Sequence, residues 1–331
     1  MAQREQDNIS KRKQRRYRRK LKKSVKIAIV AIVIVVGLGS YSAIRIYNFV
    51  HSENPYGKVD DTGTQGDIEQ IDLLQTEATY EILSVGNGES IFIKYGDTEA
   101  LIDTGGGKSE KTLLESLSGR ITGKLDYLII TSPSAGRTGN VGAVANKYEI
   151  GTCILGELGG SLSSVKGLVS GRAEKVIDGE NLTYDFGDGV TLFVIKPEVS
   201  SDDPLDRSLV TYFTYSDKGF VALSDAGKEE IARALSGIER TEAIVLARNG
   251  NEDLLSGLNN IVQSHYYIAS ASKSSGFPTP KAEELFSSKA FSTGDKGTIK
   301  FIMSGTDMNT TLDSSYKEGE QAESDGGTAG S

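Results

Sequence analysis

The feature that constrains this chain most is an uncharged apolar segment, residues 27–44, with the sequence IAIVAIVIVVGLGSYSAI. A helix of that length spans about 27 Å, which matches the hydrocarbon thickness of a bilayer. Tyr41 and Tyr47 lie near the C-terminal end of the segment, where amphipathic rings favour the membrane interface. We therefore expect one transmembrane helix over residues 27–48, in contact with membrane lipid.

The charge of the chain is distributed unevenly around this segment. Residues 1–26 contain twelve Lys and Arg and two acids, a net charge of +10, whereas the whole chain carries −8, so the rest carries −18. Positive charge beside an apolar segment stays in the cytoplasm. This predicts a single-pass protein of the cell membrane with a cytoplasmic basic arm, residues 1–26, and an extracytoplasmic remainder.

Two alternatives to this interpretation stay open. Ser40 and Ser42 satisfy the small-residue rule for cleavage, so the segment could be a signal peptide, although its apolar run exceeds a typical signal core. The basic arm could bind nucleic acid, but the neighbouring apolar segment already accounts for its charge.

Composition divides the remainder into three parts. Residues 49–76 are polar and contain Gly, Asp and Pro, which is typical of a stalk or linker. Residues 77–304 have ordinary globular composition and are expected to form one domain. Residues 305–331 lack apolar periodicity and are expected to be a disordered tail.

Histidine and cysteine are too scarce for several kinds of site. The chain has two histidines, His51 and His265, and one cysteine, Cys153. These numbers exclude an intrachain disulfide and a His-rich or Cys-rich zinc cluster. Cys153 lies in an apolar run, which favours a buried, inert thiol.

The globular part begins with short β-rich runs separated by glycine-containing turns, and then alternates strands with helical patterns. Residues 125–130 (LDYLII) form a nearly continuous apolar run, typical of a strand buried on both faces. A helix is expected over residues 108–117 and another over residues 252–262. The same order of elements occurs twice, which predicts an α/β protein with helices packed outside two sheets.

Five segments, in order, resemble the metallo-β-lactamase superfamily and, within it, the hydrolase-like domain of ComEC-type DNA-uptake proteins. The family's motifs VGQGDS…LIDTGG, LDxLIITHxDxDHxGG, SLVL…LLTGDA, VLKVxHHGS and GHP have counterparts over most of the domain. The matching segments are SVGNGESIFIKYGDTEALIDTGG (84–106), LDYLIITSPSAGRTGN (125–140), DRSLVTYFTYSDKGFVALSDAG (206–227), AIVLARNGN (243–251) and IASASKSSGFPTP (268–280). The resemblance implies an αββα sandwich of two sheets with outer helices.

The resemblance also implies where a metal site should lie, and this chain departs from the family there. Zinc-type hydrolase sites need imidazole and carboxylate ligands that lower the pKa of a bound water. The positions that match family ligands are Ser132, Ser134, Gly136, Arg137, Asp225, Asn249 and Phe277. Of these, Asp225 alone retains the acid of the family motif. Asp103, from the IDTGG motif, is expected to have a structural role in a site loop.

We interpret the chain as a pseudo-hydrolase that binds or scaffolds an unknown protein or anionic ligand. Arg137 and Arg248 at the degenerate site could bind an anion, because guanidinium groups bind carboxylate or phosphate in bidentate fashion. No catalytic residue and no cofactor are expected. One alternative is an active phosphodiesterase or nuclease with zinc or manganese; another is a DNA-binding uptake accessory, which the charge of −18 disfavours.

Overall fold

The computed structural model describes residues 76–313. The predicted basic arm, the transmembrane helix over residues 27–48, the stalk up to residue 75 and the tail from residue 314 lie outside the described residues. Within residues 76–313, no helix is long and apolar enough to cross a membrane.

The first sheet, sheet A, has eight strands in the order β15-β14-β1-β2-β3-β4-β5-β6. Strands β3 to β6 are parallel, and the other pairs are antiparallel. Its strands are β1 (Ala78–Ile82), β2 (Ile91–Tyr95), β3 (Thr98–Ile102), β4 (Lys124–Ile130), β5 (Glu149–Leu155), β6 (Ala173–Asp178), β14 (Ile299–Ser304) and β15 (Asp307–Thr310).

The second sheet, sheet B, has seven strands in the order β13-β12-β11-β10-β9-β8-β7. Strands β10 to β13 are parallel, whereas β7 to β10 are antiparallel neighbours. Its strands are β7 (Leu182–Gly187), β8 (Val190–Ile195), β9 (Val210–Tyr215), β10 (Lys218–Ala222), β11 (Arg240–Val245), β12 (Gln263–Ala269) and β13 (Ala290–Ser292).

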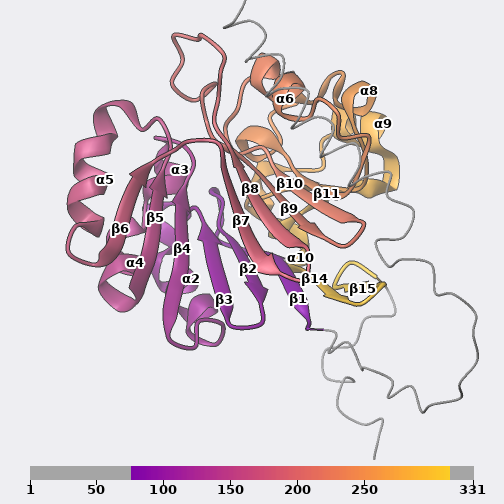
Figure 1. Ribbon diagram of the computed structural model, residues 1–331. Helices are drawn as coiled ribbons and strands as arrows, with labels where there is room; N and C mark the ends of the chain where they lie inside the picture. The colour runs from indigo at the N-terminus through magenta and orange to yellow at the C-terminus, as the bar shows by residue number, and fades with distance from the viewer. Residues whose placement is uncertain (1–75, 314–331) are drawn as a thin grey trace, which may run out of the picture. The chain divides into compact units, whose positions relative to one another are not determined.

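Helices cover the outer face of each sheet (Figure 1). Sheet A packs on α2 (Glu110–Ser118), α4 (Val141–Lys147) and α5 (Leu162–Val169) through one apolar cluster. Sheet B packs through another cluster on α6 (Lys228–Ala234), α7 (Glu252–Leu255), α8 (Leu258–Ile261) and α9 (Pro280–Phe286). The short helices α3 (Ala135–Thr138) and α10 (Thr293–Lys296) lie in loops. The predicted layout of two sheets with outer helices is confirmed.

A third apolar cluster fills the space between the two sheets. At its centre, Phe220 of β10 lies 4.9 Å from Tyr80 of β1 and 5.2 Å from Phe301 of β14, measured between ring centroids. Strand β4 is buried on both faces as predicted, because Ile129 joins this cluster while Leu128 packs on the outer helices. Cys153 on β5 is fully buried, and burial raises the pKa of its thiol to about 12.

The structure corrects two boundaries. The predicted disordered tail begins too early, because β15 pairs with β14 in a hairpin that continues sheet A beyond residue 304. The helix predicted over residues 252–262 is two short helices, α7 and α8. Gly257 separates them with a backbone φ of 86°, a left-handed conformation that an α-helix cannot continue through.

The parallel strands of the two sheets place their carboxyl ends where polar loops meet. Asp103 follows β3, Thr131 follows β4, and Asp225 comes shortly after β10. Hydrogen bonds from the loop after β4 reach the loop after β10, so these ends of the two sheets lie side by side. In open α/β sheets this is the edge at which sites form.

Candidate functional site: a buried guanidinium between the two sheets

The loops at this edge have an unusual backbone. Asp103, Ser224, Arg248 and Asn249 all have positive φ angles, between 50° and 58°. These four residues are among only seven such non-glycine residues in the described part of the chain. Left-handed backbone at non-glycine residues costs of order 1 kcal/mol or more and concentrates at functional sites. The loops are therefore held in place by their surroundings.

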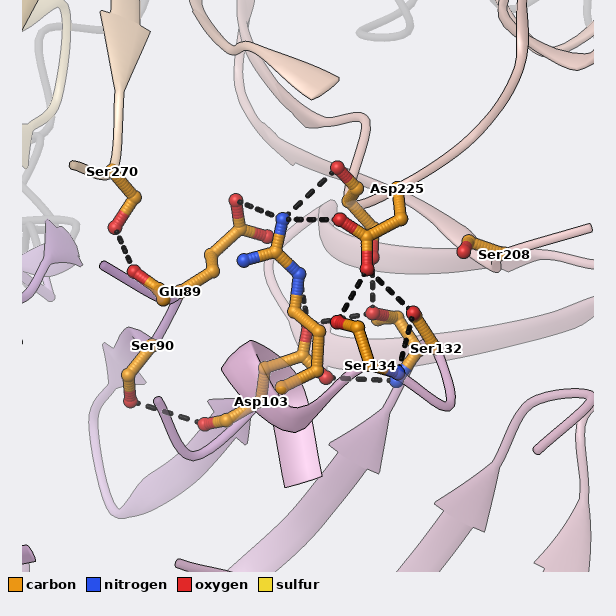
Figure 2. A network of polar contacts seen from close by, with 12 residues as sticks. Glu89, Ser90, Asp103, Ser132, Ser134, Ser208, Asp225 and Ser270 are labelled. Atoms are coloured by element: carbon orange, nitrogen blue, oxygen red, sulfur yellow. Dashed lines mark hydrogen bonds and ion pairs between the residues drawn. The ribbon is translucent and has the colours of Figure 1, made fainter. Parts of the chain in front are cut away.

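Arg137 of α3 lies at the centre of these loops and is only 1% exposed. Its Nη2 lies 3.1 Å from Asp225 Oδ1 and 3.6 Å from Glu89 Oε2, and its Nε lies 3.5 Å from Asp103 Oδ2. Nη2 also donates a hydrogen bond to the Ser224 carbonyl oxygen at 3.0 Å. We call Arg137, Glu89, Asp103 and Asp225 the charged centre. Figure 2 labels its three acidic residues, Glu89, Asp103 and Asp225.

Two serines complete the surroundings of Asp225. Ser132 Oγ and Ser134 Oγ donate hydrogen bonds to Asp225 Oδ2 at 2.5 and 2.6 Å, as Figure 2 shows. Both serines stand where the family resemblance places metal ligands. In this chain they donate to a carboxylate, so Asp225 is held by hydroxyl groups and a guanidinium.

Asp103 is held in a similar way from sheet A. It accepts hydrogen bonds from the Thr131 backbone N–H at 2.8 Å and from Thr131 Oγ1 at 2.6 Å. Thr131 Oγ1 also forms a short hydrogen bond with Ser224 Oγ, across to sheet B. The structural role of Asp103 in a site loop stays a prediction.

The charged centre contains three carboxyl groups for one guanidinium, all of them buried. Burial raises the pKa of Glu89, and the nearby charge of Asp225 raises it too, although Arg137 acts in the opposite direction. Burial also raises the pKa of Asp103 well above its usual range, against the lowering effect of Arg137. Burial alone lowers the pKa of Arg137, but the charges of Glu89, Asp225 and Asp103 together raise it. The guanidinium therefore stays charged.

Glu89 is the least satisfied member of the centre. It is 0% exposed, and neither of its carboxyl oxygens has a hydrogen-bond partner among the described residues. Its backbone is well held, because Glu89 N–H donates to the Gly136 carbonyl oxygen at 3.0 Å. Ionising a buried carboxyl group whose nearest positive charge is an ion-pair partner at 3.6 Å is costly.

We expect Glu89→Gln to reduce the loss of stability that follows a rise in pH. A carboxyl group whose pKa is raised by folding contributes stability at pH values below its unfolded pKa of about 4.5, and this contribution disappears as pH rises through the folded pKa. The wild-type free energy of unfolding should fall by up to about 1.4 kcal/mol per pH unit for this one proton. Urea unfolding at a series of pH values above 4.5 measures the slope.

The exposed Glu115 of α2 provides the matched control for that measurement. Glu115→Gln should leave the slope of the wild-type protein unchanged. Equal slopes for wild type and Glu89→Gln across the same pH range would show that Glu89 is not a buried, proton-binding group.

Arg248 turns away from the charged centre. Its Nη2 lies 2.6 Å from Asp206 Oδ1 and 3.1 Å from Asp203 Oδ2, and its Nε donates to the Asp225 carbonyl oxygen at 3.0 Å. The two arginines that we expected to bind an anion together are thus each directed at the protein's own carboxylates. Anion binding by Arg137 and Arg248 stays a prediction.

The remaining residues predicted for the site have different positions. Asn249 Oδ1 accepts a hydrogen bond from Arg137 Nη1 at 3.3 Å, so Asn249 contacts the charged centre. Gly136 contributes only its backbone carbonyl. Phe277 is buried in the apolar cluster outside sheet B and lies close against Gly250, where a Cβ atom would come within 2.7 Å of the ring. Phe277 is a packing residue.

Three residues of the site were not predicted from the sequence: Glu89, Thr131 and Ser224. A signal for Glu89 was available, because the family motif VGQGDS has an acid at the position that Glu89 occupies in VGNGES. The same holds for Thr131, because the motif LDxLIITH has threonine at that position. Ser224 carried no such signal, since single hydroxyl residues beside strands are common.

A zinc or manganese ion does not fit these residues. Such ions need imidazole, thiolate or carboxylate ligands, whereas the seven expected ligand positions supply a single carboxylate, Asp225, beside two hydroxyls, a glycine, an amide, a phenyl ring and a guanidinium. A guanidinium has no lone pair to donate and repels a cation. Consistent with this chemistry, residues 76–313 contain no group of three or more His, Cys, Asp or Glu arranged to hold a metal ion.

Fold and site together define a two-sheet α/β sandwich whose loops surround a buried guanidinium.

No known family profile and no curated protein matches the chain. Among solved structures, it is similar to the metallo-β-lactamase fold protein YhfI from Bacillus subtilis, at 11% identity and a TM-score of 0.49, over 70% of this chain and 100% of YhfI.

Two further similar structures have lower TM-scores than YhfI. The metallo-β-lactamase MIM-1 from Novosphingobium pentaromativorans is 16% identical with a TM-score of 0.37, over 55% of this chain and 80% of its own. Zinc-bound PqqB from Methylobacterium extorquens is 10% identical with a TM-score of 0.38, over 51% and 72%. At these values the comparisons assign neither a family nor an activity.

Proposed function

We propose that the protein is a membrane-anchored, extracytoplasmic relative of the metallo-β-lactamase superfamily that has lost its metal site and acts by binding or scaffolding a partner. In its sequence motifs it resembles the hydrolase-like domain of ComEC-type proteins. Support for the fold part comes from the αββα layout and from the five ordered motifs. Support for the membrane anchor comes from the uncharged segment 27–44 and the basic arm before it.

One observation supports the loss of hydrolytic chemistry above all others. The Arg137 guanidinium lies between Asp225 and Glu89, with Asp103 at its Nε, at the place where the family motif would supply its ligands. Hydrolases of this fold activate water on a metal ion, and a permanent positive charge at the same place opposes binding of that ion. The geometry therefore favours a non-catalytic protein over the hydrolase alternative.

The full-length chain, recovered from the membrane fraction with detergent after growth with zinc and manganese, provides the test. We expect a metal content far below one ion per chain and no turnover of a generic phosphodiester substrate. Recovery in the soluble fraction without detergent would contradict the anchor. Stoichiometric metal with turnover that disappears in Asp225→Ala would contradict the loss of the site.

A further inference from the structure

The Arg137 side chain contacts loops that belong to both sheets. Toward sheet A it faces Glu89, before β2, and Asp103, after β3. Toward sheet B it contacts the segment after β10, through the Ser224 carbonyl and Asp225. Its backbone carbonyl also accepts hydrogen bonds from Thr104 N–H at 2.8 Å and Thr104 Oγ1 at 2.9 Å. One residue thus connects the loops of both sheets.

The carboxyl groups around Arg137 can be buried in these positions only if a cation lies beside them. Glu89 and Asp103 are 0% exposed and Asp225 is 5% exposed. Leaving several carboxyl groups buried together without a positive charge costs much more than losing a hydrogen bond, because each loses its hydration without compensation. In a metal-binding site an exchangeable ion supplies that charge. In this chain a covalently attached group supplies it.

We infer that the Arg137 guanidinium is a fixed internal counter-ion, which holds the loops of sheets A and B together in place of an exchangeable metal ion. The inference rests on the proposed loss of the metal site, and it adds a specific role for the residue at that site. Arg137 and Glu89 are also inaccessible from solvent, so a ligand can contact them only if the surrounding loops move.

The shape of the guanidinium explains why arginine suits this role. Its three nitrogens face different partners: Nη1 donates to Asn249, Nη2 donates to Asp225 and the Ser224 carbonyl, and Nε makes no hydrogen bond but lies 3.5 Å from Asp103 Oδ2 in an ion pair. A planar fork with five donors can meet all of these directions at once. A lysine ammonium is a single point charge and can reach only part of the set.

Thermal unfolding of full-length Arg137 variants tests the inference. Arg137→Met removes the charge and keeps most of the stem; we expect the melting temperature to fall by roughly 10 °C or more, because a buried charge loses its partner. Arg137→Lys restores a charge without the fork and should melt between Arg137→Met and wild type. Arg207→Met, which removes a partly exposed arginine paired with Glu157, is the matched control and should change the melting temperature by only a few degrees.

A second substitution separates a counter-ion from a packing residue. Asp225→Asn should lower the melting temperature of the wild-type protein, since it removes the partner of Arg137. In the Arg137→Met background the same substitution should raise the melting temperature, since it removes an uncompensated charge. A packing role for Arg137 predicts no such change of sign.

The outcomes that overturn the inference are specific. Arg137→Met with the melting temperature of wild type would do so, as would an Asp225→Asn effect of the same sign in both backgrounds. If Arg137→Met does not fold, recovery of folded protein in Arg137→Met/Asp225→Asn supports the inference, and continued failure to fold overturns it. The metal content of the wild-type chain tests the proposed function separately, so a failure of the proposed function can be told apart from a failure of this inference alone.

Discussion

Replacing Gly139 with alanine should destabilise the protein by about 3 kcal/mol or more, because the new methyl group would overlap backbone atoms that cannot rotate away. A Cβ at residue 139 would lie 2.2 Å from Gly107 N, 2.6 Å from the Gly106 carbonyl carbon and 2.8 Å from the Gly105 carbonyl oxygen. Gly139 has helical angles, φ −59° and ψ −30°, so alanine could adopt its backbone and the cost is steric alone.

The clash would also disturb the charged centre. Gly139 N–H donates to the Gly105 carbonyl oxygen at 3.0 Å, and the loop that must move begins at Asp103. Urea unfolding monitored by circular dichroism measures the effect. Gly119→Ala is the control, because Gly119 also ends a helix with φ −94° and has nothing within 4 Å of its Cβ position. Equal free energies of unfolding for the two variants would show that the loop of residues 105–107 moves at little energetic cost to make room for the methyl group.

Phe220→Ala should cost about 3–5 kcal/mol, the range for deleting a large aromatic ring from a core. Phe220 is 0% exposed and contacts rings of both sheets, Tyr80 and Phe301 from sheet A and Phe213 from sheet B. Its removal leaves a cavity at the point where the sheets meet. The midpoint of urea unfolding should fall while the slope of the transition stays constant, since the surface exposed on unfolding hardly changes.

Phe193 provides the matched control for this substitution. It lies on strand β8 of the same sheet, separated from β10 by β9, is half-buried and stacks on Tyr212 with a centroid separation of 6.0 Å. Phe193→Ala removes the same atoms from a position that solvent already reaches, so its effect should be clearly smaller. A loss at Phe220 no larger than the loss at Phe193 would mean that the inter-sheet core closes around the cavity.

Sequence patterns predicted two kinds of element: strands that are buried on both faces, and helices that bury one apolar face along their length. Residues 125–130 were predicted as a doubly buried strand, and β4 is one. A helix was also predicted over residues 108–117, and in α2 Leu113 and Leu117 pack in the apolar cluster of sheet A. These signals were strong because burial on both sides of an element leaves little choice of residue type.

The strands that were missed lie at the edges of the sheets. Strands β6 and β7 read AEKVID and LTYDFG. All their residues are half-buried or exposed, in strict alternation in β7 and without alternation in β6. An edge strand is paired on one side only and tolerates charged residues, which help to prevent pairing with other chains. Its sequence therefore resembles a loop. The helix α5 between β5 and β6 was missed with them.

The candidate site was only partly predictable. The motif order placed Ser132, Ser134, Arg137 and Asp225 in neighbouring loops, and the structure brings these four together. The burial of Arg137, and the fact that its partners are carboxyl groups of the chain itself, could not be predicted. That depends on which way side chains turn in three dimensions, and a one-dimensional motif carries no such information.

The position of β1 has a consequence for the order in which the domain is completed. Strand β1 lies between β2, its neighbour in sequence, and β14, which begins at Ile299. During synthesis β1 therefore has one open edge until more than two hundred further residues have emerged. Pairing strands that are so far apart in the sequence is slow, because the chain loses conformational entropy before the stabilising contacts between the strands have formed. Of the strands in residues 76–313, the first to be made is therefore among the last to gain its full set of hydrogen bonds.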